Sequence, residues 1–148
     1  NMLMSFMAGK LPLAVRGGYD FVDVRDVASG ILACTERGLP GRGYILSGHY
    51  ATIREILETV KQSLNIKRRV SYLPIFFAKL IAPIYEKWSL WRSEPLYFTP
   101  EAVSVLDSNG GFSRRAAGLE LGYVPRPLKE TIRDTVLWIK HTPLKGSL

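Results

Sequence analysis

The segment from Tyr19 to Ala28, with the sequence YDFVDVRDVA, constrains the fold more than any other part of this chain. Its aromatic and β-branched residues favour a strand, and Asp26 is a good N-cap for the small apolar run that follows. We therefore expect a strand over 19–24 that runs directly into a helix from Asp26 to about Arg37. Three residues at helical spacing are expected on the buried face of that helix: Val27, Ile31 and Cys34.

The rest of the chain alternates between short strand patterns and longer helical patterns. Short strands are expected over 13–16, 43–46 and 70–73. Helices are expected over 2–9, 52–65, 75–91, 99–109, 114–121 and 127–143, with a kink or break at Pro83. Thr52 and Glu55 have the spacing of a capping box, which strengthens the second of these helices. The order βαβα followed by further helices indicates an α/β fold, with short strands and several packing helices, rather than a helical bundle.

Composition indicates a globular protein and excludes some classes of partner. The 148 residues are 47% hydrophobic and 22% charged, which suits one domain with a real core. The formal net charge is +7, but the basic residues are dispersed and are not interleaved with stacking aromatics, so we expect no nucleic-acid partner. The one cysteine, Cys34, can form no internal disulfide, and we expect a buried inert thiol and a cytoplasmic protein.

Three longer blocks carry a family resemblance. They are AGKLPLAVRGGYDFVDVRDVA (8–28), GRGYILSGHYATIREILETVKQSLN (41–65) and FSRRAAGLELGYVPRPLKETIRDTVLWIK (112–140). In order and spacing they resemble the extended short-chain dehydrogenase/reductase family, the NAD-dependent epimerase/dehydratases, and most closely its dihydroflavonol reductase-like branch. Such blocks lie late in that family's sequences. The resemblance therefore implies that residues 1–148 are a C-terminal substrate-binding portion, with the N-terminal Rossmann half absent.

The resemblance also implies a function for the parent protein. A member of this family would bind NAD or NADP in its Rossmann half and transfer hydride between the nicotinamide and a carbonyl or alcohol carbon of a small molecule. The present fragment is expected to be inactive alone and to bind no cofactor. The alternative is a non-catalytic module of the same architecture that senses a dinucleotide or binds another protein.

Catalytic, cofactor-binding and metal-binding residues are not found in the sequence. The family's catalytic pair is a Tyr with a Lys four positions later, and no tyrosine of this chain has a lysine at that offset. Gly38, Gly41 and Gly43 have the wrong spacing for a dinucleotide fingerprint and lie between a helix and a strand. His49 and His141 are the only histidines, and neither lies in a metal-binding motif. A paired-carboxylate site among the aspartates at 20, 23 and 26 is conceivable, but capping and solvation explain them more simply.

An aromatic segment after the middle of the chain is the best candidate for contact with a substrate. We expect five residues to line a substrate pocket: Trp88, Trp91, Arg92, Tyr97 and Phe98. Packing of the same rings in the core is the alternative explanation.

The expected partners follow from the apolar content and the missing half. Residues 70–91 are very apolar, but Lys79 interrupts them and prolines break them, so a membrane partner is not favoured, although attachment by an amphipathic helix stays open. Surface that would pack on a Rossmann half is expected to be hidden instead by a homo-oligomer or an element-swapped dimer.

Overall fold

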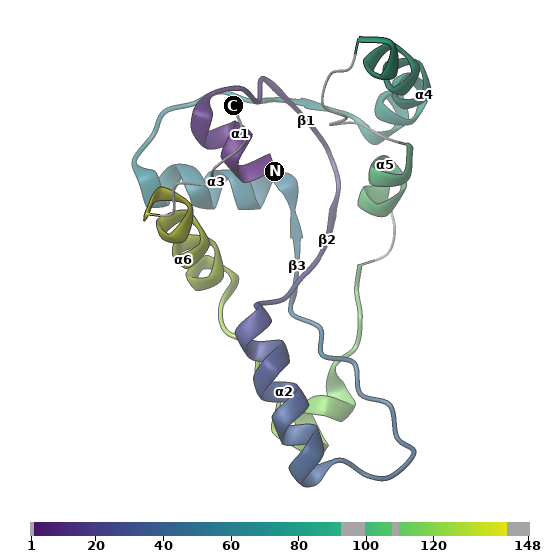
Figure 1. The fold of residues 1–148 in the computed structure, drawn as a ribbon, viewed down its shortest axis with the longest axis vertical. Helices are drawn as coiled ribbons and strands as arrows, with labels where there is room; N and C mark the ends of the chain where they lie inside the picture. The colour runs from purple at the N-terminus through teal and green to yellow at the C-terminus, as the bar shows by residue number, and fades with distance from the viewer. Residues whose placement is uncertain (1, 93–99, 108–109, 142–148) are drawn as a thin grey trace. The chain divides into compact units, whose positions relative to one another are not determined.

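The computed structural model describes residues 2–92, 100–107 and 110–141, and only the backbone of Pro83, 85–92 and Ala102. Figure 1 shows short strands joined by helices. The strands are β1 (Leu13–Val15), β2 (Gly18–Phe21), β3 (His49–Thr52) and β4 (Ser71–Leu73). The helices are α1 (Met2–Ala8), α2 (Val24–Arg37), α3 (Ile53–Leu64), α4 (Ile75–Arg92), α5 (Pro100–Asp107), the π-helix η1 (Ala117–Leu121) and α6 (Leu128–His141). The predicted α/β class is confirmed.

One predicted strand is wrong. Residues 43–46 were expected to form a short buried strand, but no strand is assigned there, and β3 begins only at His49. The side chain of Ile45 is 52% exposed. A strand needs a hydrogen-bonding neighbour, and no described strand pairs with this segment.

The chain divides into two compact units, of which unit 1 comprises residues 1–19 and 52–109. Its sheet is a parallel pair in which Leu13, Ala14 and Val15 of β1 face Ser71, Tyr72 and Leu73 of β4. The backbone N–H of Arg16 continues the ladder by donating to the carbonyl of Leu73 at 2.8 Å. The helices α4 and α5 lie side by side next to β1 (Figure 1). They share a core of Val15, Ala78, Ala82 and Val103.

The helix α3 follows the sequence prediction closely. Thr52 is its N-cap, and the Thr52 hydroxyl and the Glu55 carboxylate form both halves of the capping box. Asn65 ends the helix in the left-handed region, with φ 51°, as its short polar side chain permits. The buried face of α3 is apolar and consists of Ile53, Ile56, Leu57 and Val60.

The prediction for Pro83 was a kink or a break, and a break is wrong, because α4 is not divided there. It runs as one segment of 18 residues. A single proline removes only one hydrogen bond of the helix, and the turns on either side hold the remaining ones. The small side chains of Ala78 and Ala82 are buried, at 3% and 1% exposure, and attach this helix to the core of unit 1.

Unit 2 comprises residues 20–51 and 110–148. The predicted cap of α2 was Asp26, but the cap is Asp23, whose side chain accepts a hydrogen bond from the backbone N–H of Arg25. Asp26 instead lies in the first turn, 7% exposed, and pairs with Arg126. The helix begins earlier than predicted because Asp23 offers the same capping chemistry, and Asp26 has a cationic partner distant in sequence.

The core of unit 2 lies between the second half of α2 and η1 (Figure 1). Ala117, Leu121 and Tyr123 are buried there, and Cys34 packs partly buried against them. The predicted buried position of Ile31 is wrong, because its side chain is 55% exposed. The two buried residues of α2 are Asp26 and Gly30; Val27 is half-buried, whereas Val24, Ile31 and Leu32 are exposed.

Candidate functional site

A pocket of about 320 Å³ lies in unit 1 at the carboxyl end of the parallel strand pair. It is lined by Arg16, Gly17, Thr52, Arg54 and Tyr72. Arg16 directly follows β1, Tyr72 lies within β4, and Arg54 is in the first turn of α3. Loops and helix starts at the carboxyl ends of parallel strands are the usual place for ligands in α/β proteins. The fold therefore directs these side chains toward one space.

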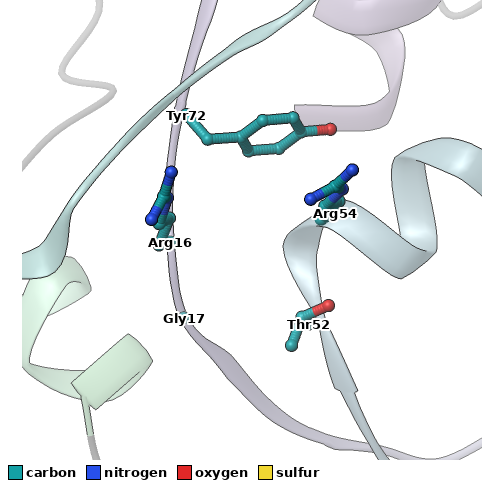
Figure 2. A pocket seen from close by; sticks show the side chains of 5 residues that line it. All are labelled: Arg16, Gly17, Thr52, Arg54 and Tyr72. Atoms are coloured by element: carbon teal, nitrogen blue, oxygen red, sulfur yellow. The ribbon is translucent and has the colours of Figure 1, made fainter.

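Two guanidinium groups face this pocket from different elements. Figure 2 shows Arg16 and Arg54 on opposite sides of the space, with the ring of Tyr72 across one end. The Cζ atom of Arg54 lies 5.9 Å from the centre of the Tyr72 ring, a cation–π distance that helps to hold this guanidinium in place. Neither arginine is in an ion pair with a carboxylate among the described residues. Their charges are available to an anionic ligand.

The two hydroxyl groups beside the arginines differ in their hydrogen bonding. The Thr52 hydroxyl is engaged in the capping box, donating to Glu55 Oε2 at 2.8 Å and accepting from the Glu55 N–H at 3.2 Å. The Tyr72 hydroxyl is buried and has no hydrogen-bond partner among the described residues. Burial raises the pKa of Tyr72, so this hydroxyl stays protonated at neutral pH.

The pocket therefore suits binding more than proton transfer. Two fixed positive charges and an aromatic wall can recognise a phosphate or carboxylate and orient the molecule that carries it. The lining residues include no carboxylate, histidine or lysine that could serve as a general base.

Comparisons with known proteins identify two that are similar to this chain in sequence. No family model matches it. It is 26% identical over 142 residues to sterol demethylase protein B of Methylococcus capsulatus, covering 94% of this chain and 43% of that protein. It is 23% identical over 145 residues to a putative dihydroflavonol 4-reductase of Synechocystis, covering 95% of this chain and 42% of that protein.

Solved structures of similar fold also match most of this chain. The crystal structure of gox2253 has a TM-score of 0.73 and 28% identity, and covers 94% of this chain and 42% of that one. A nucleoside-diphosphate-sugar epimerase of Pseudomonas aeruginosa, PA4631, has a TM-score of 0.68 at 20% identity, over 93% of this chain and 40% of the epimerase. In sequence and fold the chain is similar to proteins of the extended short-chain dehydrogenase/reductase type. It spans less than half the length of these relatives.

Members of the extended short-chain dehydrogenase/reductase family hold a dinucleotide on a glycine-rich strand-to-helix turn, and the described residues do not fit this role. A cradle glycine is needed where the backbone must approach the pyrophosphate at a helix start. Gly41 and Gly43 follow a helix and are exposed, and a Cβ atom built on either would meet nothing within 4 Å. Gly48 lies close to Phe21 and Val22, so its small size serves strand packing.

The five substrate-lining residues predicted from sequence stay predictions. Trp88, Trp91 and Arg92 lie on α4, but their side chains are outside the described part of the structure. Tyr97 and Phe98 lie outside the described residues altogether.

The pocket residues were not found from the sequence. The sequence patterns assign Arg54 only to the helix expected over 52–65, and Tyr72 only to the strand expected over 70–73. A signal does exist for Arg16 and Tyr72. Parallel pairing of 13–16 with 70–73 would bring the end of the first strand near the end of the second. That pairing is not local, and no pattern in either segment specifies it.

The described residues contain no group of three His, Cys, Asp or Glu side chains that could hold a metal ion. None of the helices in the described part is long and apolar enough to cross a membrane.

Proposed function

We propose that this chain is the C-terminal, substrate-binding portion of an NAD(P)-dependent epimerase, dehydratase or reductase. It acts with a nucleotide-binding portion that is not part of these 148 residues. That portion would supply the Tyr-x-x-x-Lys base and the cofactor, and the reaction would move hydride between the nicotinamide and a carbonyl or alcohol carbon. The similar proteins support this proposal, because they include a putative dihydroflavonol 4-reductase and a nucleoside-diphosphate-sugar epimerase. One further solved relative by fold, RMD of Pseudomonas aeruginosa, has a TM-score of 0.55 and is described as complexed with NADPH.

The observation that carries the proposal is the pocket with Arg16 and Arg54 on facing sides. A substrate-binding portion needs a cavity that recognises the non-reacting part of a small molecule. Two arginines that have no carboxylate partner within the described part of the chain favour an anionic group there. A volume of about 320 Å³ fits one such group with its neighbouring atoms.

The exposed face of α2 supports the presence of a second portion. Val24, Ile31 and Leu32 are 77%, 55% and 65% exposed. A folded protein seldom leaves large apolar side chains of one helix uncovered unless another surface packs on them. In the proposed assembly this helix lies against the nucleotide-binding portion, and in the isolated chain a second copy covers it.

Two measurements on the isolated chain test the proposal. The first is isothermal titration with inorganic pyrophosphate, for which saturable binding is expected, lost in Arg16→Gln/Arg54→Gln and retained in Arg69→Gln. Arg69 is an exposed arginine of the same unit and does not line the pocket. The second is NADPH oxidation with a panel of aldehydes and ketones, for which no turnover is expected. Turnover by the chain alone, or equal pyrophosphate binding by all variants, would refute the proposal.

A further inference from the structure

The side chain of Tyr72 meets the pocket with its ring and not with its hydroxyl group. Tyr72 is the central residue of β4 and pairs in register with Ala14 of β1. Its hydroxyl is buried and has no hydrogen-bond partner among the described residues. A hydroxyl that water cannot reach cannot bind a ligand in the pocket, and leaving it unpaired is unfavourable. The function of Tyr72 in the pocket wall therefore has to come from its ring.

The ring of Tyr72 lies beside the guanidinium of Arg54. Figure 2 shows the ring extending from β4 across the space toward this guanidinium, whose Cζ atom lies 5.9 Å from the ring centre. Burial raises the pKa of Tyr72, so the ring stays neutral and the contact is a cation–π contact rather than an ion pair. No hydrogen bond or ion pair from the described part of the chain holds the Arg54 guanidinium. The ring is thus what restricts it there.

Arg16, the other arginine of the pocket, is held differently. Its backbone N–H donates to the carbonyl of Leu73 at 2.8 Å, but within the described ranges its guanidinium has neither a ring nor a carboxylate beside it. A long side chain without partners samples many rotamers, and a ligand that must order such a side chain binds more weakly. For Arg54, part of this ordering is complete before any ligand binds.

We propose that Tyr72 is a positioning residue for Arg54. The face of its ring holds the guanidinium on the side of the pocket opposite Arg16, where an anion can contact both arginines, and the Tyr72 hydroxyl takes no part. The identity of the ligand rests on the proposed function. The order of Arg54 in the free protein does not, because it depends on the ring alone.

Two variants separate the ring from the hydroxyl. Tyr72→Phe keeps the ring, whereas Tyr72→Leu removes the ring and keeps an apolar side chain in β4. In ¹⁵N heteronuclear NOE spectra of the free chain, the Arg54 Nε–Hε group should be more ordered than that of Arg16, both in the wild type and in Tyr72→Phe. In Tyr72→Leu the Arg54 value should fall to that of Arg16. Equal Arg54 values in all three proteins, or equal losses in both variants, would overturn the proposal.

Titration with inorganic pyrophosphate gives a second readout. Tyr72→Phe should bind within about two-fold of the wild type, and Tyr72→Leu about five-fold more weakly. Phe6→Leu is the matched control, because Phe6 is a buried aromatic residue of unit 1 that does not line the pocket. Its affinity should stay within about two-fold of the wild type. A loss in Phe6→Leu as large as that in Tyr72→Leu would indicate general damage to the core and would contradict the proposal.

The two measurements also separate this proposal from the proposed function. A wild type that binds no pyrophosphate would refute the proposed function, whereas the NOE comparison needs no ligand and still decides the role of Tyr72. If Tyr72→Leu does not fold, Tyr72→Met, which also lacks the ring, takes its place with the same expected results.

Discussion

Arg126 binds Asp26 across one hundred positions of sequence by two hydrogen bonds of 2.8 Å. Its backbone N–H donates to Oδ2 and its side-chain Nε donates to Oδ1. Asp26 is 7% exposed, and the same guanidinium lies 3.6 Å from Asp23, the cap of α2. The loop before α6 is thereby attached to the first turn of α2 within unit 2.

Removal of this guanidinium should destabilise the protein. Arg126→Met keeps much of the side-chain volume but leaves the buried Asp26 carboxylate without its charged partner. We expect the free energy of unfolding, measured in urea, to fall by about 2–3 kcal/mol. Arg133→Met is the control, because Arg133 is 62% exposed and its one ion pair among the described residues is with its neighbour Asp134, at 3.6 Å. Equal stability of the two variants would show that the Arg126 pair contributes nothing.

The stability of the chain should fall in acid because of the same cluster. The hydrogen bond from the Arg25 side chain holds the pKa of Asp23 far below its usual value. Burial of Asp26 opposes ionisation, but hydrogen bonds from Arg126 outweigh it and lower the pKa of that carboxyl. A carboxyl whose pKa is lower in the folded state than in the unfolded state stabilises the protein above the unfolded pKa of about 3.9. This stabilisation is lost as the pH falls through the folded-state pKa.

Urea unfolding from pH 7 down to pH 2 measures this dependence. The wild type should lose stability progressively below about pH 4. Asp23→Asn keeps a capping side chain but cannot ionise, so its curve should be flatter in the acid range. Parallel curves for the two proteins would contradict the assignment of this acid sensitivity to Asp23.

Gly48 is a position where a methyl group cannot fit. A Cβ atom there would lie 1.9 Å from the carbonyl oxygen of Phe21. The backbone of Gly48 is also held on both sides, since its N–H donates to Asp20 at 2.7 Å and its carbonyl accepts from Arg114. Gly48→Ala should lower the free energy of unfolding by about 2–3 kcal/mol. Gly43→Ala, which meets nothing within 4 Å, should change it by less than about 0.5 kcal/mol.

The isolated chain should self-associate through α2. Roughly 400 Å² of exposed apolar surface costs about 10 kcal/mol, which is comparable to the stability of a whole domain. Light scattering should give a mass above the 16.6 kDa of one chain, and Ile31→Ser/Leu32→Ser should shift it toward the monomer. A wild type that stays monomeric at high concentration would exclude this form of association.

Local chemistry made part of the fold predictable. The capping box of Thr52 and Glu55 and the end of the helix at Asn65 depend on residues within a few positions, and both were predicted correctly. Residues 43–46 have the composition of a strand but pair with none in the described structure, so pattern alone gave the wrong answer. Asp26 was taken as a cap because its partner, Arg126, comes one hundred positions later.

The pocket could not be predicted from the sequence, because it is formed by contacts between segments that are distant in sequence. Arg16 and Arg54 are brought together where the backbone N–H of Ile53 donates to the carbonyl of Gly17 at 2.9 Å, and the parallel pairing of β1 with β4 adds Tyr72. The aromatic residues that sequence analysis favoured instead, Trp88 to Phe98, were chosen for composition. Their role stays a prediction.

We propose that Arg16 and Arg54 together receive the anionic group of a substrate. This can be tested by arginine side-chain NMR of the chain, labelled with ¹⁵N at Nε and titrated with inorganic pyrophosphate. We expect saturable shifts of the Arg16 and Arg54 Nε resonances with one shared dissociation constant, while Arg69 shifts little. Uniform small shifts across all arginines, without saturation, would show that the two arginines form no binding site.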